Sequence, residues 1–340
     1  MRAAILYTPG DIRLEQVPTP TATPGHVLLR VAAVGVCGSD LPRMLIKGAH
    51  KMPIICGHEF SGHIVELGAG VDGFAVGDLC TVPPMLPCHK CDQCERGQFS
   101  RCRDYDYFGS RRDGAYAEYV AVPVGNLLKA PDGCDPAAAA MVDPASIALH
   151  AIWKAGGIGM GQRGGVIGCG PIGLFAIQWM RLMGASEVVA IDVSPEKLAQ
   201  AREAGASHCY LAGDDLPSHL LCDTIIEAAG HPSSINTAIR LAAPGGHVAF
   251  IGIPVGDVAL DNKTFQHVLR QEVSLHGSWN SFGAPYPGPQ WTVTLDKLAS
   301  GALKWQFMIS HDLRLEELPG MFGRLQSERG MFFSKIMFRP

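Results

Sequence analysis

A glycine-rich turn between a predicted strand and a predicted helix constrains the fold of this chain more than any other feature. Residues 168–173 read Gly-Cys-Gly-Pro-Ile-Gly, which fits the pattern G-x-G-x-x-G. Apolar residues at 166–168 predict a strand before the turn, and an amphipathic run at 174–184 predicts a helix after it. A second predicted strand, 187–192, then ends in an aspartate. This order is typical of a doubly wound parallel sheet that binds a dinucleotide.

The residue types in this turn suit a pyrophosphate. Gly168 permits the tight turn and Gly170 lets the backbone approach the ligand, while Gly173 allows close packing of helix on strand. Asp192 can accept hydrogen bonds from a ribose hydroxyl and would repel a 2′-phosphate, so the sequence favours NAD over NADP. The alternative is a glycine-rich turn without a cofactor. The residues expected to contact the dinucleotide here are Gly168, Gly170, Pro171, Ile172, Gly173, Asp192 and Lys197, the last of which could equally be a solvated lysine.

The rest of the chain divides into two kinds of region. Up to about residue 140, short apolar runs are separated by Gly, Pro and Asp turns, which predicts a β-rich region. From about residue 144, helical segments alternate with buried-looking strands, which predicts an α/β region with a parallel sheet. A Pro-rich loop after residue 280 precedes a helix-like stretch and a terminal strand at 334–338.

Composition excludes several classes of protein. The chain has 340 residues, of which 47% are hydrophobic and 18% charged, enough for two domains with large cores. The net charge of −4 is spread along the sequence without a basic run, which argues against nucleic-acid binding. No apolar run is long enough for a membrane helix, and the N-terminus lacks the apolar core of a signal peptide. We therefore expect a cytoplasmic protein.

Four of the eleven cysteines form a dense cluster in sequence. Cys88, Cys91, Cys94 and Cys102 offer four soft ligands within fifteen residues. Thiolates at these spacings can close a tetrahedron around Zn²⁺, and the spacing favours metal over disulfides. An iron–sulfur cluster uses the same ligand type and stays open as an alternative. Because the protein would fill all four positions, the predicted site is structural.

Two further segments carry metal-binding residue types. Residues 35–40 contain Cys37, and residues 57–62 contain His58. A thiolate and an imidazole, with a third ligand and one open position, would make a catalytic zinc site. Taken singly, each residue could also be an ordinary member of the core.

The combination of these motifs, in this order and spacing, resembles the zinc-containing medium-chain alcohol dehydrogenases over essentially the whole chain. The stretches CGSDLPR with KGAH, YFGSRRDGAYAEY, and GSW followed by PGPQW resemble the branch that acts on polyol phosphates. The resemblance implies a GroES-like catalytic domain over 1–146 with a zinc lobe at 88–102, a Rossmann domain over 147–280, and a return to the catalytic domain over 281–340. It also implies an active site in the cleft between the domains, and a homodimer or homotetramer.

The resemblance assigns roles around the catalytic zinc. Cys37 and His58 would be ligands, and Asp143 stands where the polyol branch has a glutamate as third ligand. Aspartate is one methylene shorter, so a water or a backbone shift would have to compensate. Glu59 is the second carboxylate expected near the metal. Ser39 would bond the substrate hydroxyl and relay its proton, and Asp40 would orient the imidazole of His58 unless it is a turn or N-cap residue.

The resemblance also implies the remaining contacts and the reaction. Zinc would lower the pKa of a secondary hydroxyl, whose carbon gives a hydride to NAD and leaves a ketone. The expected substrate is a polyol phosphate such as galactitol 1-phosphate; an unphosphorylated polyol, as in sorbitol- or galactitol-type dehydrogenases, and a non-catalytic binding protein are the alternatives. The residues expected near the nicotinamide are Ile251, Gly252, Ile253, Ser278, Trp279 and Asn280. The residues expected to bind phosphate are Arg111 and Arg112, with Arg43 and Lys47 as secondary candidates.

Overall fold

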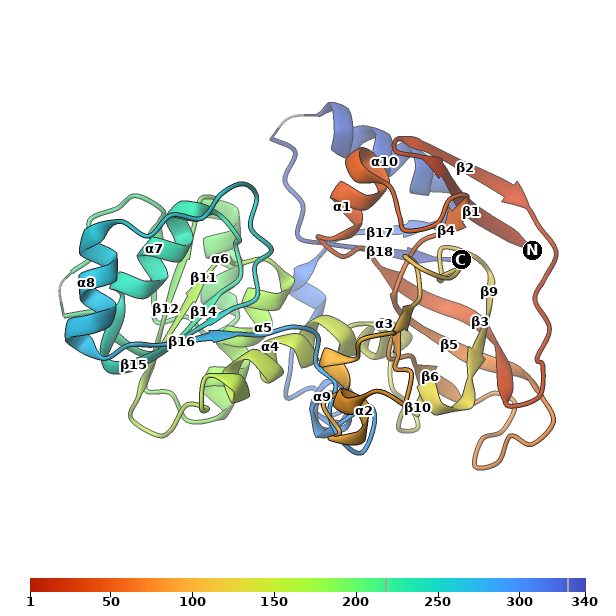
Figure 1. The fold of residues 1–340 in the computed structure, drawn as a ribbon. Coiled ribbons are helices and arrows are strands. Elements are labelled where there is room, and N and C mark those ends of the chain that lie inside the picture. Colours follow the sequence, from red (N-terminus) through yellow and green to blue (C-terminus); the bar gives the residue numbers. More distant parts are fainter. Residues whose placement is uncertain (218, 329) are drawn as a thin grey trace. The chain divides into compact units, whose positions relative to one another are not determined.

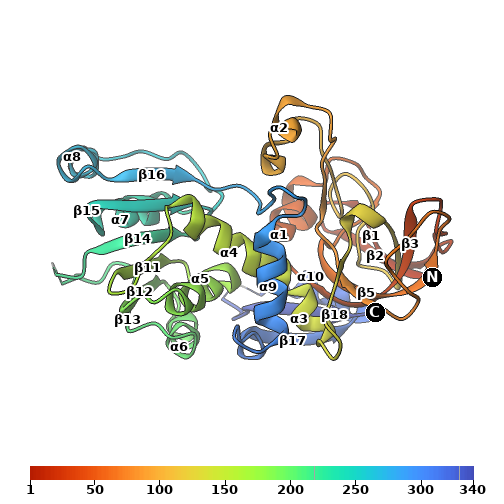
Figure 2. The ribbon, with the colours of Figure 1, turned by 90° about the horizontal axis from the view of Figure 1, so that it is seen from below.

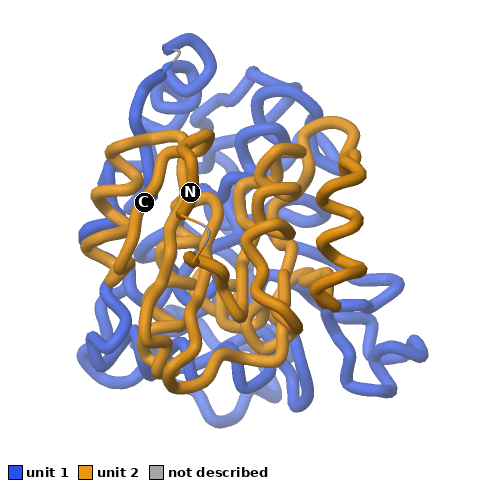
Figure 3. Tube along the Cα trace, turned by 90° about the vertical axis from the view of Figure 1, so that its left-hand side faces the viewer, with its two compact units in different colours: residues 1–143, 282–340 blue, residues 144–281 orange. Residues whose placement is uncertain are grey.

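A computed structural model describes residues 1–217, 219–328 and 330–340, and its chain forms two units. Unit 1 comprises residues 1–143 and 282–340, and unit 2 comprises residues 144–281 (Figure 3). The sequence places domain boundaries at 146/147 and 280/281, and the units divide at 143/144 and 281/282. Among the described residues, no helix is both long and apolar enough to cross a membrane.

Unit 2 contains a six-stranded parallel sheet with the order β13-β12-β11-β14-β15-β16 (Figure 2). Every neighbouring pair in this sheet is parallel. The order reverses beside β11, as in dinucleotide-binding folds, and the predicted α/β fold class is confirmed. The strands are β11 (Arg163–Ile167), β12 (Glu187–Asp192), β13 (His208–Leu211), β14 (Cys222–Glu227), β15 (Ala242–Phe250) and β16 (Ser274–Gly277).

The helices of unit 2 connect these strands. Proline occupies the first turn of α5, α6 and α7, where its missing N–H costs no helical hydrogen bond. The side chains of Ser194 and Asp261 cap α6 and α8 by accepting hydrogen bonds from backbone N–H groups. The helices are α5 (Pro171–Leu182), α6 (Pro195–Glu203), α7 (Pro232–Arg240) and α8 (Asn262–Gln271), and α4 (Val142–Lys154) begins in unit 1 and continues into unit 2.

Unit 1 is built on two larger sheets (Figure 1). One has the order β2-β1-β4, and the other has the order β10-β6-β5-β3-β18-β17 with β9 also paired to β3. The strands of the two sheets are β1 (Arg2–Thr8), β2 (Asp11–Gln16), β3 (His26–Gly35), β4 (Ile54–Ile55), β5 (Glu59–Leu67), β6 (Leu79–Thr81), β9 (Tyr119–Pro123), β10 (Leu128–Lys129), β17 (Ile309–Arg314) and β18 (Lys335–Arg339). A small third sheet pairs β7 (Met85–Leu86) with β8 (Asp106–Tyr107).

The register of three strands in unit 1 positions the candidate site. In the antiparallel pair β3–β5, Gly35 lies opposite Glu59. On the other side of β3, Met337 of β18 pairs with Gly35. The ends of β3, β5 and β18 therefore bring residues from both parts of unit 1 together, although they are far apart in the sequence.

The core of unit 1 also joins its two sequence segments. The ring of Tyr116 is fully buried and packs edge-on against Phe322 and Phe338, with centroid separations of 6.3 and 5.9 Å. Burial of such large aromatic surface strongly favours the association of residues 1–143 with 282–340. The short helices of unit 1 are α1 (Asp40–Pro42), η1 (Arg43–Lys47), α2 (Asp92–Glu95), η2 (Phe99–Arg101), η3 (Val124–Asn126), α3 (Pro136–Ala140), η4 (Gln306–Met308) and η5 (Leu315–Glu317), and its longer ones are α9 (Pro289–Ala299) and α10 (Leu318–Ser327).

Candidate active site and metal centres

Three metal-ligating side chains of unit 1 meet at the ends of β3 and β5. The ligand atoms of Cys37, His58 and Glu59 all lie within 4.8 Å of one another. Cys37 follows β3, and His58 and Glu59 stand at the start of β5, so the β3–β5 pairing creates the cluster. His58 and Glu59 are buried, and Cys37 is half-buried. The ligand atoms of Cys37 and His58, which the sequence analysis paired, thus lie close together.

Asp40 organises the groups behind this cluster. Its Oδ2 accepts hydrogen bonds from the backbone N–H of Cys37 and from the hydroxyl of Tyr116, both at 3.1 Å. Its Oδ1 accepts from the guanidinium of Arg43 and lies 3.4 Å from Nδ1 of His58. Ser39, rather than Asp40, occupies the N-cap of α1, and its hydroxyl makes no capping bond. Asp40 therefore lies where it can fix the orientation of the His58 ring.

The charges of this network shift the pKa values of both Asp40 and His58. Although burial alone would raise the pKa of Asp40, His58 and Arg43 hold that pKa well below its ordinary value. Burial lowers the pKa of His58, but the opposing effect of Asp40 and Cys37 raises it well above its ordinary value. A cation at Cys37 and His58 would displace the imidazole proton, as metal binding to histidine does generally.

Lys335 is a site residue that the sequence analysis missed. Its side chain is 1% exposed, and its Nζ forms an ion pair with Oε2 of Glu59 and donates a hydrogen bond to the carbonyl of Val36 at 3.1 Å. A Cβ on Gly35 would lie 2.7 Å from both Lys335 and Glu59, so glycine leaves the room for this pair. The signal was a lysine in an otherwise apolar terminal strand, because a buried lysine requires a charged partner.

Asp143 lies buried in the first turn of α4, in the same neighbourhood. Burial raises the pKa of its carboxyl to about 7, and the negative charge of Glu59 acts in the same direction. Of the described residues, the group that lies within 4.8 Å contains Glu59 and not Asp143. The structure therefore places both carboxylates near Cys37 and His58, but of the two only Glu59 has its ligand atom within 4.8 Å of theirs.

The donor set of this centre fits a zinc ion. Thiolate, imidazole and carboxylate are all zinc ligands, and catalytic zinc sites combine three protein ligands with one open position. Here the donors are close together and largely shielded from water, and Oδ1 of Asp40 lies 3.4 Å from Nδ1 of the imidazole. The centre thus has the ligand types and the supporting carboxylate that such a site requires.

The second cysteine cluster forms a compact lobe. The sulfur atoms of Cys88, Cys91, Cys94 and Cys102 lie within 4.8 Å of one another. The separation of 4.0 Å between Sγ of Cys88 and Sγ of Cys94 rules out a disulfide between them and is near the ~3.8 Å edge of a tetrahedron with Zn–S bonds of ~2.3 Å. The backbone N–H of Cys88 donates to Sγ of Cys102 at 3.2 Å.

The lobe has its own supports. Hydrogen bonds from backbone N–H groups, first that of Arg103, lower the pKa of Cys91 to about 6, whereas burial raises that of Cys94 to about 12. The hydroxyl of Ser100 bonds both the carbonyl and the N–H of Phe282, at 3.1 and 2.8 Å. These bonds tie the lobe to the C-terminal segment of unit 1, a contact that spacing alone does not reveal.

A tight turn joins the two predicted phosphate-binding arginines to the metal cluster. The carbonyl of Tyr107 accepts hydrogen bonds from the backbone N–H groups of Arg111 and Arg112, at 3.0 and 3.2 Å. The ring of Tyr107 packs edge-on against His58 at 5.6 Å. The side chain of Arg112 is committed to Asp106, at 3.0 Å, whereas the exposed Arg111 lies over the ring of Tyr105. Arg111 is therefore the more available cation; of the secondary candidates, Arg43 is engaged by Asp40 and Lys47 is exposed.

In unit 2, the glycine turn follows β11 and begins α5. Gly168 has a φ of +91°, and a Cβ on Gly173 would lie 1.9 Å from the carbonyl oxygen of Gly168. Gly170 differs, because its Cβ would meet no described atom within 4 Å. The first and third glycines are thus required for packing, and the middle one faces open space, as a ligand-side position would.

Asp192 ties this turn to the end of β12. Its Oδ2 accepts a hydrogen bond from the N–H of Cys169 at 2.6 Å, and its Oδ1 accepts one from the N–H of Ser194 at 3.0 Å. The carboxylate is buried, and each oxygen retains a lone pair. Lys197 lies half-buried in the first turn of α6, where its N–H donates to the hydroxyl of Ser194.

The residues predicted near the nicotinamide follow β15 and β16. The N–H groups of Ile251 and Gly252 donate to the carbonyl of Glu227, at 2.9 and 3.1 Å. Trp279 is 56% exposed, so it is not a core residue. The buried Glu227 was missed by the sequence analysis; its Oε1 accepts from the N–H groups at 229 and 230 and shapes this loop. The other predicted members are Ile253, which is exposed, Ser278, which is buried, and Asn280, which has a φ of +54°.

Comparison with known proteins places this geometry in context. The sequence model of the alcohol dehydrogenase GroES-like domain matches residues 23–132, and that of zinc-binding dehydrogenases matches residues 171–294. Galactitol 1-phosphate 5-dehydrogenase of Escherichia coli strain K12 is 36% identical over 320 residues, 92% of each chain. The crystal structure of galactitol-1-phosphate dehydrogenase from Escherichia coli has a TM-score of 0.94 at 34% identity and matches 100% of both chains. The crystal structure of a Sinorhizobium meliloti protein bound to NADP has a TM-score of 0.90 at 30% identity and matches 100% of this chain and 99% of its own.

Proposed function

The chain belongs to the zinc-binding alcohol dehydrogenase family, and we propose that it transfers a hydride from a secondary hydroxyl of a polyol phosphate to NAD. The products would be a ketose phosphate, NADH and a proton. The observation that carries the proposal is the buried cluster of Cys37, His58 and Glu59 in a chain that also has the glycine turn. A substrate such as galactitol 1-phosphate follows from the similarity to the E. coli enzyme of that name.

The chain's own residues have distinct tasks in this reaction. Bound zinc supplies a Lewis acid that lowers the pKa of the substrate hydroxyl, and bound nicotinamide supplies the hydride acceptor. Cys37 and His58 would hold the metal, and Asp40 keeps the imidazole in the orientation that this requires. The hydroxyl of Ser39, which makes no capping bond, would accept the proton of the substrate and pass it towards water.

We assign the third protein ligand to Asp143, with Glu59 as the alternative. Lys335 pairs with Oε2 of Glu59 and holds that carboxylate through a buried charge. A cation that shared the Glu59 carboxylate with Lys335 would weaken the compensation of this buried ammonium, which is costly. We therefore assign the permanent position to Asp143, and Glu59, whose ligand atom lies within 4.8 Å of those of Cys37 and His58, is the alternative.

The four-cysteine lobe would hold a second, structural zinc. Its four sulfurs leave no position for substrate, and its backbone N–H groups are directed at sulfur in the way that thiolates require. The support for zinc over an iron–sulfur cluster is that the chain belongs to the zinc-binding alcohol dehydrogenase family.

We expect a preference for NAD over NADP of at least about tenfold in kcat/KM, set by Asp192. Its buried carboxylate would bond a ribose hydroxyl and repel a 2′-phosphate. Asp192→Ala should narrow the ratio mainly because it relieves the repulsion of the 2′-phosphate of NADP. Because Asp192 also holds the turn, its removal will lower the absolute rates with both cofactors. The ratio of kcat/KM with NAD to kcat/KM with NADP, measured in the same variant, is independent of that common loss. An unchanged ratio would remove Asp192 from this role.

Arg111 should select for the phosphate group. Arg111→Gln is expected to reduce kcat/KM for the phosphorylated polyol by roughly 10- to 100-fold, because a charge-assisted hydrogen bond of ~1.5–3 kcal/mol is lost. The rate with the free polyol should hardly change. Steady-state kinetics with both substrates measures the split.

Arg112→Gln is the matched control, since its guanidinium already pairs with Asp106. Arg112→Gln should change kcat/KM for the phosphorylated polyol and for the free polyol by the same factor. Should Arg111→Gln also lower both rates equally, the arginine would be structural. An unphosphorylated polyol is the second candidate substrate, and the engagement of Arg112 by Asp106 is the observation that favours it.

We also propose that the chain forms a homodimer or homotetramer. Strand β16 is an edge of the unit 2 sheet, and an open edge can pair with a second chain. Leu275 on this strand is 41% exposed. An exposed apolar side chain at an open strand edge is typical of a surface that another subunit covers.

A further inference from the structure

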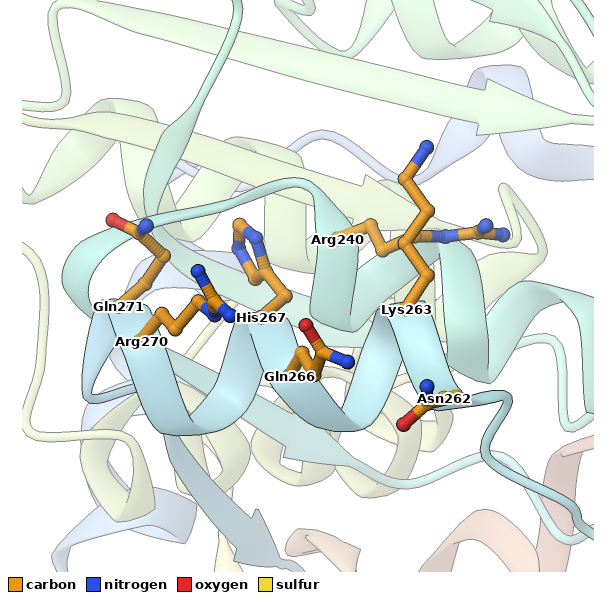
Figure 4. Close-up of a pocket in the computed structure, with 7 residues that line it drawn as sticks. All are labelled: Arg240, Asn262, Lys263, Gln266, His267, Arg270 and Gln271. Carbon is orange, nitrogen blue, oxygen red and sulfur yellow. The ribbon is translucent and has the colours of Figure 1, made fainter.

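Unit 2 has a hollow on the outer side of α8 that the proposed reaction does not use. It has a volume of about 520 Å³ and is lined by the end of α7 and by one face of α8 (Figure 4). Three of its lining side chains, Arg240, Lys263 and Arg270, are cationic, and His267 becomes so when protonated. The other three are side-chain amides, and no lining residue is acidic.

These cations are poorly compensated within the chain. The ion pair of Arg240 with Asp261 is long, at 3.7 Å, and both side chains are substantially exposed. Throughout the parts of the chain that the structure describes, Lys263 and Arg270 have no carboxylate within 4.0 Å. Three positive charges thus gather around one hollow in a protein whose net charge is −4. Such a concentration attracts anions against the sign of the whole molecule.

We propose that this hollow binds a small molecule carrying two or more linked phosphates. A volume of this size suits a small-molecule ligand, and linked phosphates offer three cations more anionic oxygens than a single phosphate does. Arginine provides paired N–H donors for phosphate oxygens, and lysine provides a point charge. Nε2 of His267 lies 2.9 Å from the carbonyl of Ala242 and donates a hydrogen bond to it, which fixes the position of the ring.

The hollow is separate from the glycine turn. The turn follows the central strand β11, whereas α8 connects β15 to the edge strand β16 along the chain. The two sites share no residue. In Figure 1, α8 is the blue helix at the outer side of the unit 2 sheet, away from α5. The proposal therefore stands independently of the dehydrogenase reaction.

The test is calorimetric titration of the full chain with inorganic tripolyphosphate. Any binding at the glycine turn is common to the unmutated chain and its variants, so a difference between variants reports the hollow alone. The variant Lys263→Gln/Arg270→Gln removes two cations of the hollow. The control Lys154→Gln/Arg202→Gln removes two exposed cations elsewhere on unit 2, so the net charge of both variants is the same. All four substitutions are at exposed positions, and thermal melting checks that both variants fold.

We expect tripolyphosphate to bind the unmutated chain and the control alike, and to bind the hollow variant at least about tenfold more weakly. Equal affinity in the hollow variant and the control, or no binding to the unmutated chain, would overturn the proposal. Titration with a nucleoside triphosphate then shows whether the hollow recognises the phosphate chain alone or a whole nucleotide. Affinity equal to that of tripolyphosphate would mean that the phosphate chain alone is recognised, and higher affinity would indicate a nucleotide. Displacement of tripolyphosphate by the nucleoside alone would contradict recognition of phosphate.

Discussion

Cys37→Ser will lower kcat by roughly 10³-fold or more while the melting temperature of the chain stays nearly unchanged. Serine has almost the shape of cysteine but keeps its proton at neutral pH, so the catalytic zinc loses a negatively charged ligand. Cys37 is only half-buried, and the exchange therefore disturbs little packing. Steady-state kinetics, thermal melting and elemental analysis together measure the effect, with zinc expected to fall from about two ions per chain to about one.

Two further variants serve as comparisons for Cys37→Ser. Cys134→Ser changes another half-buried cysteine of unit 1 outside both clusters, and it should leave rate and zinc content unchanged. Cys94→Ser should instead lower the melting temperature and release the other zinc, because it breaks the closed site of the lobe. Full activity of Cys37→Ser would show that the cluster at β3 and β5 is not the catalytic centre.

Lys335→Met is expected to destabilise the protein by ~3–5 kcal/mol, the largest stability effect we predict for a single side chain. Methionine fills most of the volume of lysine but removes the charge, so Glu59 would remain buried without its partner. The carbonyl of Val36 would also lose its donor. Denaturant unfolding followed by a probe in unit 1 measures the loss.

Two controls separate charge compensation from packing. Lys129→Met breaks an ion pair with Asp78 of 2.7 Å whose lysine is 48% exposed, and it should cost no more than ~1 kcal/mol. The double variant Lys335→Met/Glu59→Gln removes both buried charges and should recover a large part of the stability. If the double variant is destabilised by the sum of the two single changes, the pair is not coupled and the assigned role of Lys335 is wrong.

The central strands of unit 2 could be predicted because they are buried on both faces. The predicted strand at 187–192 corresponds to β12, which lies inside the parallel sheet. The edge strands β13 and β16 were not predicted. Their residues are half-buried or exposed, so they lack the continuous apolar run that identifies an internal strand.

The metal-ligating cysteines were also predictable, because sequence spacing limits how far apart their sulfurs can lie. Cys88 and Cys94, for example, are close in sequence and their sulfurs lie 4.0 Å apart. The pairing of Lys335 with Glu59 spans 276 positions and depends on the register of β18, β3 and β5, which no local pattern encodes. Likewise, the sequence presented Glu59 and Asp143 as two carboxylates, but only the side-chain contacts show that one of them is engaged by a buried lysine.

The central claim is that the cluster of Cys37, His58 and a carboxylate oxidises a phosphorylated polyol with zinc and NAD. The most direct measurement is the rate of NAD reduction by the unmutated enzyme with galactitol 1-phosphate, galactitol and sorbitol, before and after removal of zinc by a chelator. We predict the highest kcat/KM with the phosphorylated polyol, loss of activity on chelation, and recovery when zinc is restored. A higher kcat/KM with a free polyol would contradict the assigned substrate, and undiminished activity after complete removal of zinc would contradict the account of the site.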